Sequence, residues 1–221
     1  MDGPDALEID RLTVRMDGQT VLKDFSLSLP AGRKALLTGP SGCGKSTVLR
    51  CLLGFVTPET GSVRIGGEPL TAETVWRLRR HMAYVGQEPD LGVGVVRHIL
   101  EQPFHYRANA ALRGNLGRVP ELFDAFGLAR TLFDKSIGDL SGGEKQRVAL
   151  ICALLLDREI FLLDEVTSAL DPASKRRVLD YFQSRAEATA LFVAHDAEWF
   201  SFVDQVIEVS KSHSAGEPRH G

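Results

Sequence analysis

The first part of the chain alternates between apolar and polar residues. Two runs, 7–16 and 21–29, follow this pattern and are separated by Asp17 and Gly18, a pair typical of a tight hairpin turn. They predict two antiparallel strands. After a Pro-Ala-Gly turn, the short apolar run at 35–37 predicts a further strand.

Strands and helices then alternate along most of the chain. Asp171 followed by Pro172 is a typical helix start, an N-cap residue and then proline in the first turn. Alternation of this kind predicts an α/β fold, a parallel sheet with helices on both faces. The expected strands are 62–65, 83–86, 160–163, 190–194 and 205–209, and the expected helices are 47–53, 74–82, 144–155, one that begins at 171–172, and 198–202.

The stretch between Gln87 and Ser141 has a different character. Loops rich in glycine or marked by proline separate the helical patterns at 95–101 and 120–126, and no strand pattern lies among them. We therefore expect a helical insertion within a single domain. The expected boundaries are 1–209 for the domain, with its core at about 1–87 and 156–209 and the insertion at about 88–155, and 210–221 for a polar, disordered tail.

A glycine-rich segment joins the strand at 35–37 to the helix that follows it. Residues 39–46 fit the phosphate-loop pattern G-x-x-x-x-G-K-[ST], in which backbone N–H groups and a helix N-terminus attract phosphate oxygens. Lys45 is expected to reach the β- and γ-phosphates, and the Ser46 hydroxyl to bind Mg²⁺. The alternative is a plain turn before a helix. The pattern predicts a nucleoside triphosphate site formed by Gly39, Pro40, Ser41, Gly42, Cys43, Gly44, Lys45, Ser46 and Thr47.

The apolar strand at 160–163 ends in two carboxylates, Asp164 and Glu165. Ligands of α/β proteins bind outside the carboxyl ends of the strands. We expect Asp164 to hold Mg²⁺, directly or through water, and Glu165 to orient or deprotonate the water that attacks the γ-phosphate. Taken alone, two acids after a strand are more often a helix cap. The phosphate loop in the same chain favours the chemical role.

Residues 140–147 read LSGGEKQR. Ser141 can cap the following helix and Glu144 can complete a capping box, a structural role that is sufficient by itself. Gly142 and Gly143 would weaken the first turn unless something, such as a phosphate, approaches the backbone closely. Two helix N-termini that each attract phosphate cannot easily bind the same nucleotide within one chain. We therefore expect a second copy of the chain to complete the site.

Composition adds limits to this interpretation. The chain has 221 residues, 43% of them hydrophobic and 25% charged, which is ordinary globular usage. It has no apolar run of about 18 residues and no secretion signal, so we expect a soluble protein made in the cytoplasm. The three cysteines lack metal-binding spacing and are expected to be free thiols. A formal net charge of −3 gives no overall attraction to nucleic acid.

Taken in order, these motifs resemble those of the ATP-binding-cassette (ABC) ATPases over nearly the whole chain. The resemblance implies a P-loop NTPase (RecA-like) core with a parallel central sheet, an N-terminal antiparallel β subdomain and an inserted α-helical subdomain. The matching segments are GPSGCGKST at 39–47, Gln87, LSGGEKQR at 140–147, FLLDE at 161–165, SALD at 168–171 and His195.

The resemblance also implies roles for residues. Gln87 would contact Mg²⁺ and the attacking water and sense the membrane partner, and His195 would hold the γ-phosphate. Residues 141–143 would bind the γ-phosphate across a homodimer with ATP at its interface, and Asp171 would communicate between the two sites. By itself His195 is one histidine among six at a strand end, but it lies 30 residues after Glu165, as the family pattern requires.

The sequence departs from the family pattern at several positions. Met16 lies where an aromatic residue usually stacks on adenine, and a thioether can still contact the ring. Three further departures lie away from the expected chemistry: Val166 replaces a usual proline, Cys152 a usual arginine and Arg158 a frequent proline. The combination of motifs most resembles the ATP-binding subunit of Fet-type exporters, which are linked to the efflux of iron or other metals.

These observations predict an ATP-binding and ATP-hydrolysing subunit that energises a separate integral membrane subunit from the inner face of the membrane. The alternative function, of a different class, is that of a soluble ABC ATPase that acts on nucleic acid or ribosomes. Such relatives typically carry a coiled-coil insertion or two cassettes, whereas this chain has one cassette. A phosphate-loop kinase or GTPase is a third class, and LSGGEKQR argues against it. Recovery of the protein only with ribosomes or DNA would favour the second class.

Overall fold

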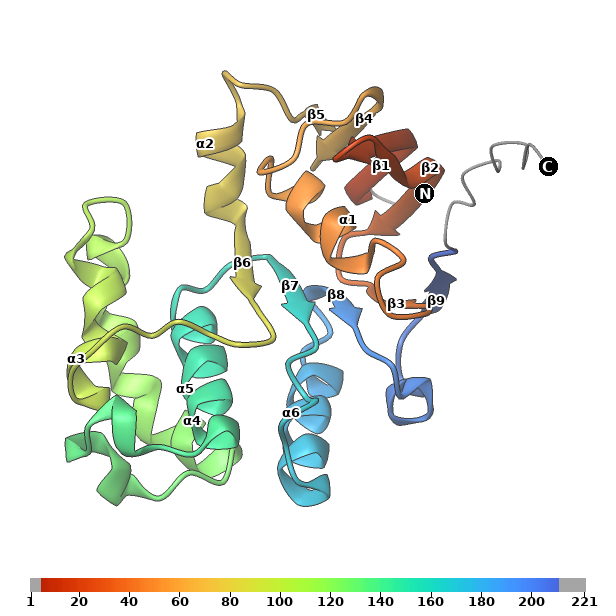
Figure 1. The fold of residues 1–221 in the computed structure, drawn as a ribbon. Helices are drawn as coiled ribbons and strands as arrows, with labels where there is room; N and C mark the ends of the chain where they lie inside the picture. The colour runs from red at the N-terminus through yellow and green to blue at the C-terminus, as the bar shows by residue number, and fades with distance from the viewer. Residues whose placement is uncertain (1–4, 211–221) are drawn as a thin grey trace.

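The computed structural model describes residues 5–210, which form two sheets and a set of helices (Figure 1). The smaller sheet is antiparallel, with its strands in the order β2-β1-β4-β5. The expected hairpin is confirmed, because Asp17 and Gly18 both have positive φ, 51° and 77°, as a two-residue hairpin turn requires. The strands are β1 (Asp5–Met16), β2 (Gln19–Pro30), β4 (Thr60–Ile65) and β5 (Glu68–Pro69).

The larger sheet has five strands in the order β6-β7-β8-β3-β9, and its neighbouring strands are all parallel. This arrangement confirms the α/β prediction. Because parallel strands end at the same edge of the sheet, the segments that follow β3, β6, β7 and β8 come together there. The strands are β3 (Lys34–Thr38), β6 (Met82–Val85), β7 (Ile160–Asp164), β8 (Thr189–Val193) and β9 (Gln205–Glu208).

Helices lie on both faces of the parallel sheet and fill the stretch between β6 and α5 (Figure 1). Among the described residues of that stretch there is no strand, only one isolated bridge between Val95 and Ser136. The α-helices are α1 (Lys45–Leu52), α2 (Val75–Leu78), α3 (Val96–Glu101), α4 (Val119–Ala125), α5 (Gly142–Leu155) and α6 (Pro172–Ser184). The short 3₁₀ helices are η1 (Arg79–His81), η2 (Gln102–His105), η3 (Ala110–Arg118), η4 (Arg130–Asp134), η5 (Ile137–Asp139) and η6 (Ala197–Phe200).

The expected helix at 74–82 is wrong at its C-terminal end. The α-helix ends at Leu78, a 3₁₀ turn follows, and Met82 already belongs to β6. Met82 pairs with Ile160 of β7 and is buried, so pairing with a distant strand overrides the local helical tendency. The short helix expected at 198–202 is a 3₁₀ turn over Ala197–Phe200.

The core lies on both faces of the parallel sheet. On β7, Phe161 and Leu163 pack with α5, α6 and the helices between β6 and α5, whereas Ile160 and Leu162 pack with α1 and the antiparallel sheet. A strand covered on both faces reads as a continuous apolar run, as this one does. Burial of each such side chain contributes about 1.5–3 kcal/mol, so the strand and the loop after it are held firmly.

Three remaining expectations concern the whole chain. The cysteines are free, as expected. Apart from Ser210, the expected polar tail lies outside the described residues. Within residues 5–210, no helix combines the length and the apolar character needed to cross a lipid bilayer.

Candidate functional site

The phosphate loop at 39–47 connects β3 to α1 and needs its glycines for two reasons. Gly42 and Gly44 have φ of 73° and 108°, a region that side chains disfavour. A Cβ on Gly39 would lie 2.3 Å from the carbonyl oxygen of Val209, and one on Gly44 would lie 2.8 Å from Leu22. The loop can therefore take this path only with glycine at these positions.

Lys45, the first residue of α1, points back over this loop. Its side chain is buried, and its Nζ donates hydrogen bonds to the carbonyl oxygens of Gly39, at 2.8 Å, and Pro40, at 3.1 Å. The ammonium group therefore stands at the mouth of the loop, with its charge opposed by neutral carbonyls. A phosphate oxygen at this position would offer a stronger, charge-assisted partner.

A cavity of about 250 Å³ lies above the loop. The loop residues in its wall carry backbone N–H groups, hydroxyls and one ammonium group, and this donor set fits phosphate oxygens. A Cβ on Gly42 would meet no atom within 4 Å, so the loop faces open space at this point. The cavity is lined by Val21, Ser41, Gly42, Gly44, Lys45, Ser46, Thr47, Gln87 and Glu165.

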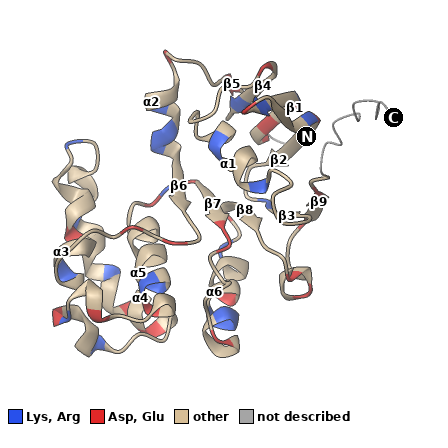
Figure 2. Ribbon diagram, viewed as in Figure 1, with Lys and Arg blue, Asp and Glu red and all other residues tan. Residues whose placement is uncertain are grey.

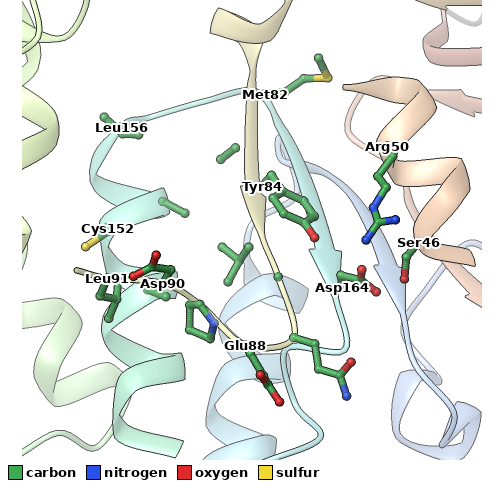
Figure 3. A pocket seen from close by; sticks show the side chains of 17 residues that line it. Ser46, Arg50, Met82, Tyr84, Glu88, Asp90, Leu91, Cys152, Leu156 and Asp164 are labelled. Carbon is green, nitrogen blue, oxygen red and sulfur yellow. The ribbon is translucent and has the colours of Figure 1, made fainter. Parts of the chain in front are cut away.

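Asp164 ends β7 beside the loop. Its carboxylate is hydrogen-bonded by the hydroxyls of Ser46 and Tyr84, and Figure 3 shows the three side chains close together. Burial raises the pKa of this carboxyl above its ordinary value, and the neighbouring Glu165 also raises it, while the Ser46 hydrogen bond opposes the shift. A hydroxyl and a carboxylate side by side are oxygen ligands of the kind that Mg²⁺ binds, so the expected pair fits that ion.

Glu165 follows in a left-handed backbone conformation, with φ of 50°. Its N–H donates to the carbonyl of Val193 at 2.9 Å, and its own carbonyl accepts from the Ser168 N–H and hydroxyl. The conformation is costly for glutamate and is held by these bonds, as is common at functional sites. The Glu165 Oε1 lies 3.0 Å from Nε2 of His195, which follows β8. The structure thus brings the expected base and histidine together.

Gln87 follows β6 and lines the phosphate-loop cavity as well as a second, larger one. The preceding Gly86 is fixed by Gln146 of α5, whose Nε2 donates to its carbonyl at 3.1 Å. Gln146 is 1% exposed, and among the described residues its Oε1 has no hydrogen-bond partner. The link ties the start of the Gln87 loop to α5.

Ser141, Gly142 and Gly143 begin α5 but do not line the phosphate-loop cavity. The expected capping box is present: the Ser141 hydroxyl accepts from the Glu144 N–H, and the Glu144 carboxylate accepts from the Ser141 N–H at 2.8 Å. A Cβ on Gly142 would meet no atom within 4 Å, so this turn presents open backbone. One chain alone does not bring this segment to the loop.

The other predicted site residues are Pro40 and Cys43 of the loop, Met16 at the end of β1 and Asp171 at the start of α6. Pro40 and buried Cys43 shape it, and neither is among the residues that line the cavity. Met16 is 38% exposed at the end of β1 and does not line the cavity, whereas Val21 of the same hairpin does. Asp171 caps α6, as expected, by accepting hydrogen bonds from the N–H groups of residues 173 and 174.

The larger cavity, of about 640 Å³, lies between β6, α1 and α5 (Figure 3). Tyr84, Arg50 and Cys152 lie on three different sides of it. Because β6 is the edge strand of the parallel sheet, this cavity is an open groove beside that edge. Sequence reasoning missed Tyr84 and Gln146, although a lone polar tip on the apolar run at 83–86 was a signal for Tyr84.

Comparison with known proteins agrees with this geometry. The sequence model of the family described as "ABC transporter" matches residues 22–168. The Escherichia coli K12 protein "Probable iron export ATP-binding protein FetA" is 34% identical over 194 residues, which is 85% of this chain and 83% of that protein. The Leuconostoc mesenteroides protein "Mesentericin-Y105 transport/processing ATP-binding protein MesD" is 30% identical over 97% of this chain. This chain spans 30% of the length of MesD.

Solved structures give the same result. A bacterial Atm1-family ABC exporter with ATP bound superimposes with a TM-score of 0.79 and 25% identity, over 96% of this chain and 38% of the exporter chain. The cbiO1 protein of Clostridium perfringens, part of the transporter complex cbiONQ, shares the fold with a TM-score of 0.79 at 23% identity, over 96% of this chain and 86% of that one. The chain therefore belongs to the ABC transporter family and carries its nucleotide-binding ATPase domain.

Proposed function

We propose that this chain binds ATP with Mg²⁺ at the phosphate loop, hydrolyses it, and so energises a separate membrane-spanning transport subunit. The observation that carries the proposal is the convergence of the phosphate loop, Asp164, Glu165 and His195 at one edge of the parallel sheet. Such convergence is what phosphoryl transfer needs, because its catalysis depends on positioning and charge.

The roles follow from the contacts. The loop amides and Lys45 hold the phosphates, and Ser46, Asp164 and Gln87 provide oxygen ligands for Mg²⁺. When bound, the ion neutralises charge on the phosphate oxygens. Glu165 orients the attacking water and accepts its proton, and its carboxylate is held ready by His195 at 3.0 Å. His195 also reaches the γ-phosphate.

The Ser141 segment completes the site of a second copy. Its open backbone at Gly142 and the helix N-terminus behind it suit a phosphate, yet it does not line its own chain's phosphate-loop cavity. Two copies related by a twofold axis can each present this segment to the partner's ATP. A homodimer with ATP at its interface accounts for both observations.

The groove beside β6 is the proposed seat of the membrane subunit. Two exposed aromatic residues near it, Phe55 and Trp76, hold the Arg79 guanidinium between them, at 4.3 and 5.0 Å from the ring centroids. Tryptophan and arginine are enriched in binding hot spots. Figure 2 shows basic residues along α2 and the η1 turn that follows it. Because Gln87 lines both the groove and the phosphate-loop cavity, docking and hydrolysis can influence one another.

The transported substance is proposed from similarity alone. FetA is named for iron export, and 85% of this chain aligns with it, so we propose export of iron or another metal from a position on the inner face of the membrane. Among residues 5–210 no cluster of His, Cys, Asp and Glu is arranged to hold a metal ion. Selection of the metal is therefore assigned to the membrane subunit. The second class, action on nucleic acid or ribosomes, is not favoured by the relatives' names.

The experiment is the substitution Glu165→Gln. The amide keeps the shape of the side chain but cannot accept the proton, so we expect ATP binding within about twofold of the unsubstituted protein and a loss of turnover of at least about 100-fold. Glu121→Gln, at an exposed position on α4, is the matched control and should leave turnover unchanged. Unchanged hydrolysis by Glu165→Gln would remove this residue from the chemistry and overturn the proposed site.

A further inference from the structure

The first turn of α6 carries a lysine that the proposed chemistry does not use. Lys175 is buried, and a lysine is almost never fully buried unless its charge is paired. Its Nζ donates to Oδ2 of Asp196 at 2.9 Å and lies 4.9 Å from the ring centroid of Trp199. An ion pair and an aromatic face thus hold its charge against the loop that follows β8.

That loop also contains the histidine of the site. Asp196 follows His195 directly, and its carboxylate is 60% exposed, as is usual for a residue on a surface loop. The hydrogen bond from Lys175 lowers the pKa of the Asp196 carboxyl, so this carboxyl is ionised at neutral pH. Fixing Asp196 fixes the backbone from which the imidazole reaches Oε1 of Glu165.

The turn of α6 that carries Lys175 is itself anchored to α5. Arg147 of α5 is buried, and its guanidinium donates to the Ser174 hydroxyl and lies 3.9 Å from the Asp171 carboxylate. Asp171 in turn caps α6. Lys175 therefore extends from a helix turn that is anchored to α5, so its ammonium group has little freedom to move.

From this geometry we propose that Lys175 is a positioning residue, which holds Asp196 and thereby keeps His195 in contact with Glu165 and the γ-phosphate. The proposal rests on the proposed function, since it assigns Lys175 a part in the same site. Lys175 does not line the phosphate-loop cavity, so we assign it no direct contact with the nucleotide.

The test compares Lys175→Met with Lys175→Arg. Methionine removes the charge, so we expect kcat for ATP to fall about 10- to 100-fold while ATP affinity stays within about twofold, because misplacement of a reacting group lowers turnover more than binding. Arginine restores the ion pair and should recover most of the turnover. Arg176→Met is the matched control: Arg176 lies 5.1 Å from the same Trp199 ring, is exposed and has no contact with Asp196, so turnover should be unchanged.

A second set of variants separates positioning from general damage. In a His195→Ala background, Lys175→Met should cause no further loss, because the residue through which it acts is gone. An additional loss there would overturn the proposal. Asp196→Asn, at an exposed side chain, should lower kcat as Lys175→Met does and serves if the latter does not fold. If Glu165→Gln and His195→Ala lose turnover but Lys175→Met and Asp196→Asn do not, this inference fails and the proposed function stands.

Discussion

At the scale of single residues, Asp164 shows how the site trades stability for function. The residue is 6% exposed and precedes Glu165, and burial raises the pKa of its carboxyl. An acid whose pKa is raised on folding destabilises the folded state whenever it is ionised. A bound cation would offset this cost. The residue is therefore best explained by the ligand that it is proposed to hold.

We predict that Asp164→Asn raises the melting temperature of the nucleotide-free protein at neutral pH and abolishes Mg²⁺-dependent hydrolysis. The gain in stability should be complete above the folded-state pKa and should disappear as the pH falls below 3.8, the ordinary value, where the carboxyl is protonated in both states. Thermal denaturation across pH, with an ATPase assay at neutral pH, checks both parts. A variant that is less stable than the unsubstituted protein at neutral pH would contradict the prediction.

At the scale of elements, the start of α5 has a structural and a proposed chemical role. The capping box between Ser141 and Glu144 satisfies backbone donors at the helix start, which leaves the amides of Gly142 and Gly143 for a ligand. The two interpretations of LSGGEKQR made from the sequence are thus compatible.

We expect Ser141→Ala to lower the free energy of unfolding by about 1 kcal/mol because the cap is lost. For a chain of this size, that corresponds to a melting temperature about 2–4 °C lower, measured without nucleotide. Ser141→Asn is the matched control, since asparagine caps helices as well as serine does. Equal melting temperatures for the two variants would show that the cap does not contribute to stability.

At the scale of the whole molecule, we propose that the site of one chain is completed by a second copy. The Ser141 segment does not line the phosphate-loop cavity of its own chain, and twofold pairing is the proposed way to bring the two together. The open space at Gly142 allows a test that spares the fold, because a side chain there meets no atom of its own chain.

Two inactive variants should restore activity when they are mixed. Lys45→Ala disables the phosphate loop, and Gly142→Asp places a negative charge where the partner's phosphate would lie, in a helix turn that favours acids. Random pairing makes half of the dimers mixed, each with one intact site, so we expect recovery of roughly a quarter of full ATPase activity. Absence of recovery in mixtures of folded variants would exclude composite sites.

Much of the site could be predicted because its motifs are local. The phosphate loop, the capping box and the Asp171 cap each depend on residues within a few positions, so their spacing is visible in the sequence. The contact between Lys175 and Asp196 spans 21 positions, and Lys175 belongs to a Lys-Arg-Arg run that is typical of a solvated helix face. Its burial results from tertiary packing, which the sequence pattern does not show.

Tertiary contacts also explain why the end of α2 and the role of Gln146 were not predicted correctly from the sequence. The end of α2 was predicted too late because the pairing of Met82 with Ile160 joins residues 78 positions apart. Gln146 was missed because a glutamine in a polar stretch resembles a surface residue, although it is 1% exposed. In both cases a long-range contact decides the outcome over a local preference.

The close approach of Val209 to Gly39 has a practical meaning for anyone who modifies this protein. The Val209 N–H bonds to the carbonyl of Thr38 at 2.8 Å, and its own carbonyl fills the space that a larger residue at 39 would need. The residue that follows β9 thus supports the start of the phosphate loop. Trimming the chain to 208 would remove this contact, so affinity tags and fluorescent fusions belong beyond Ser210.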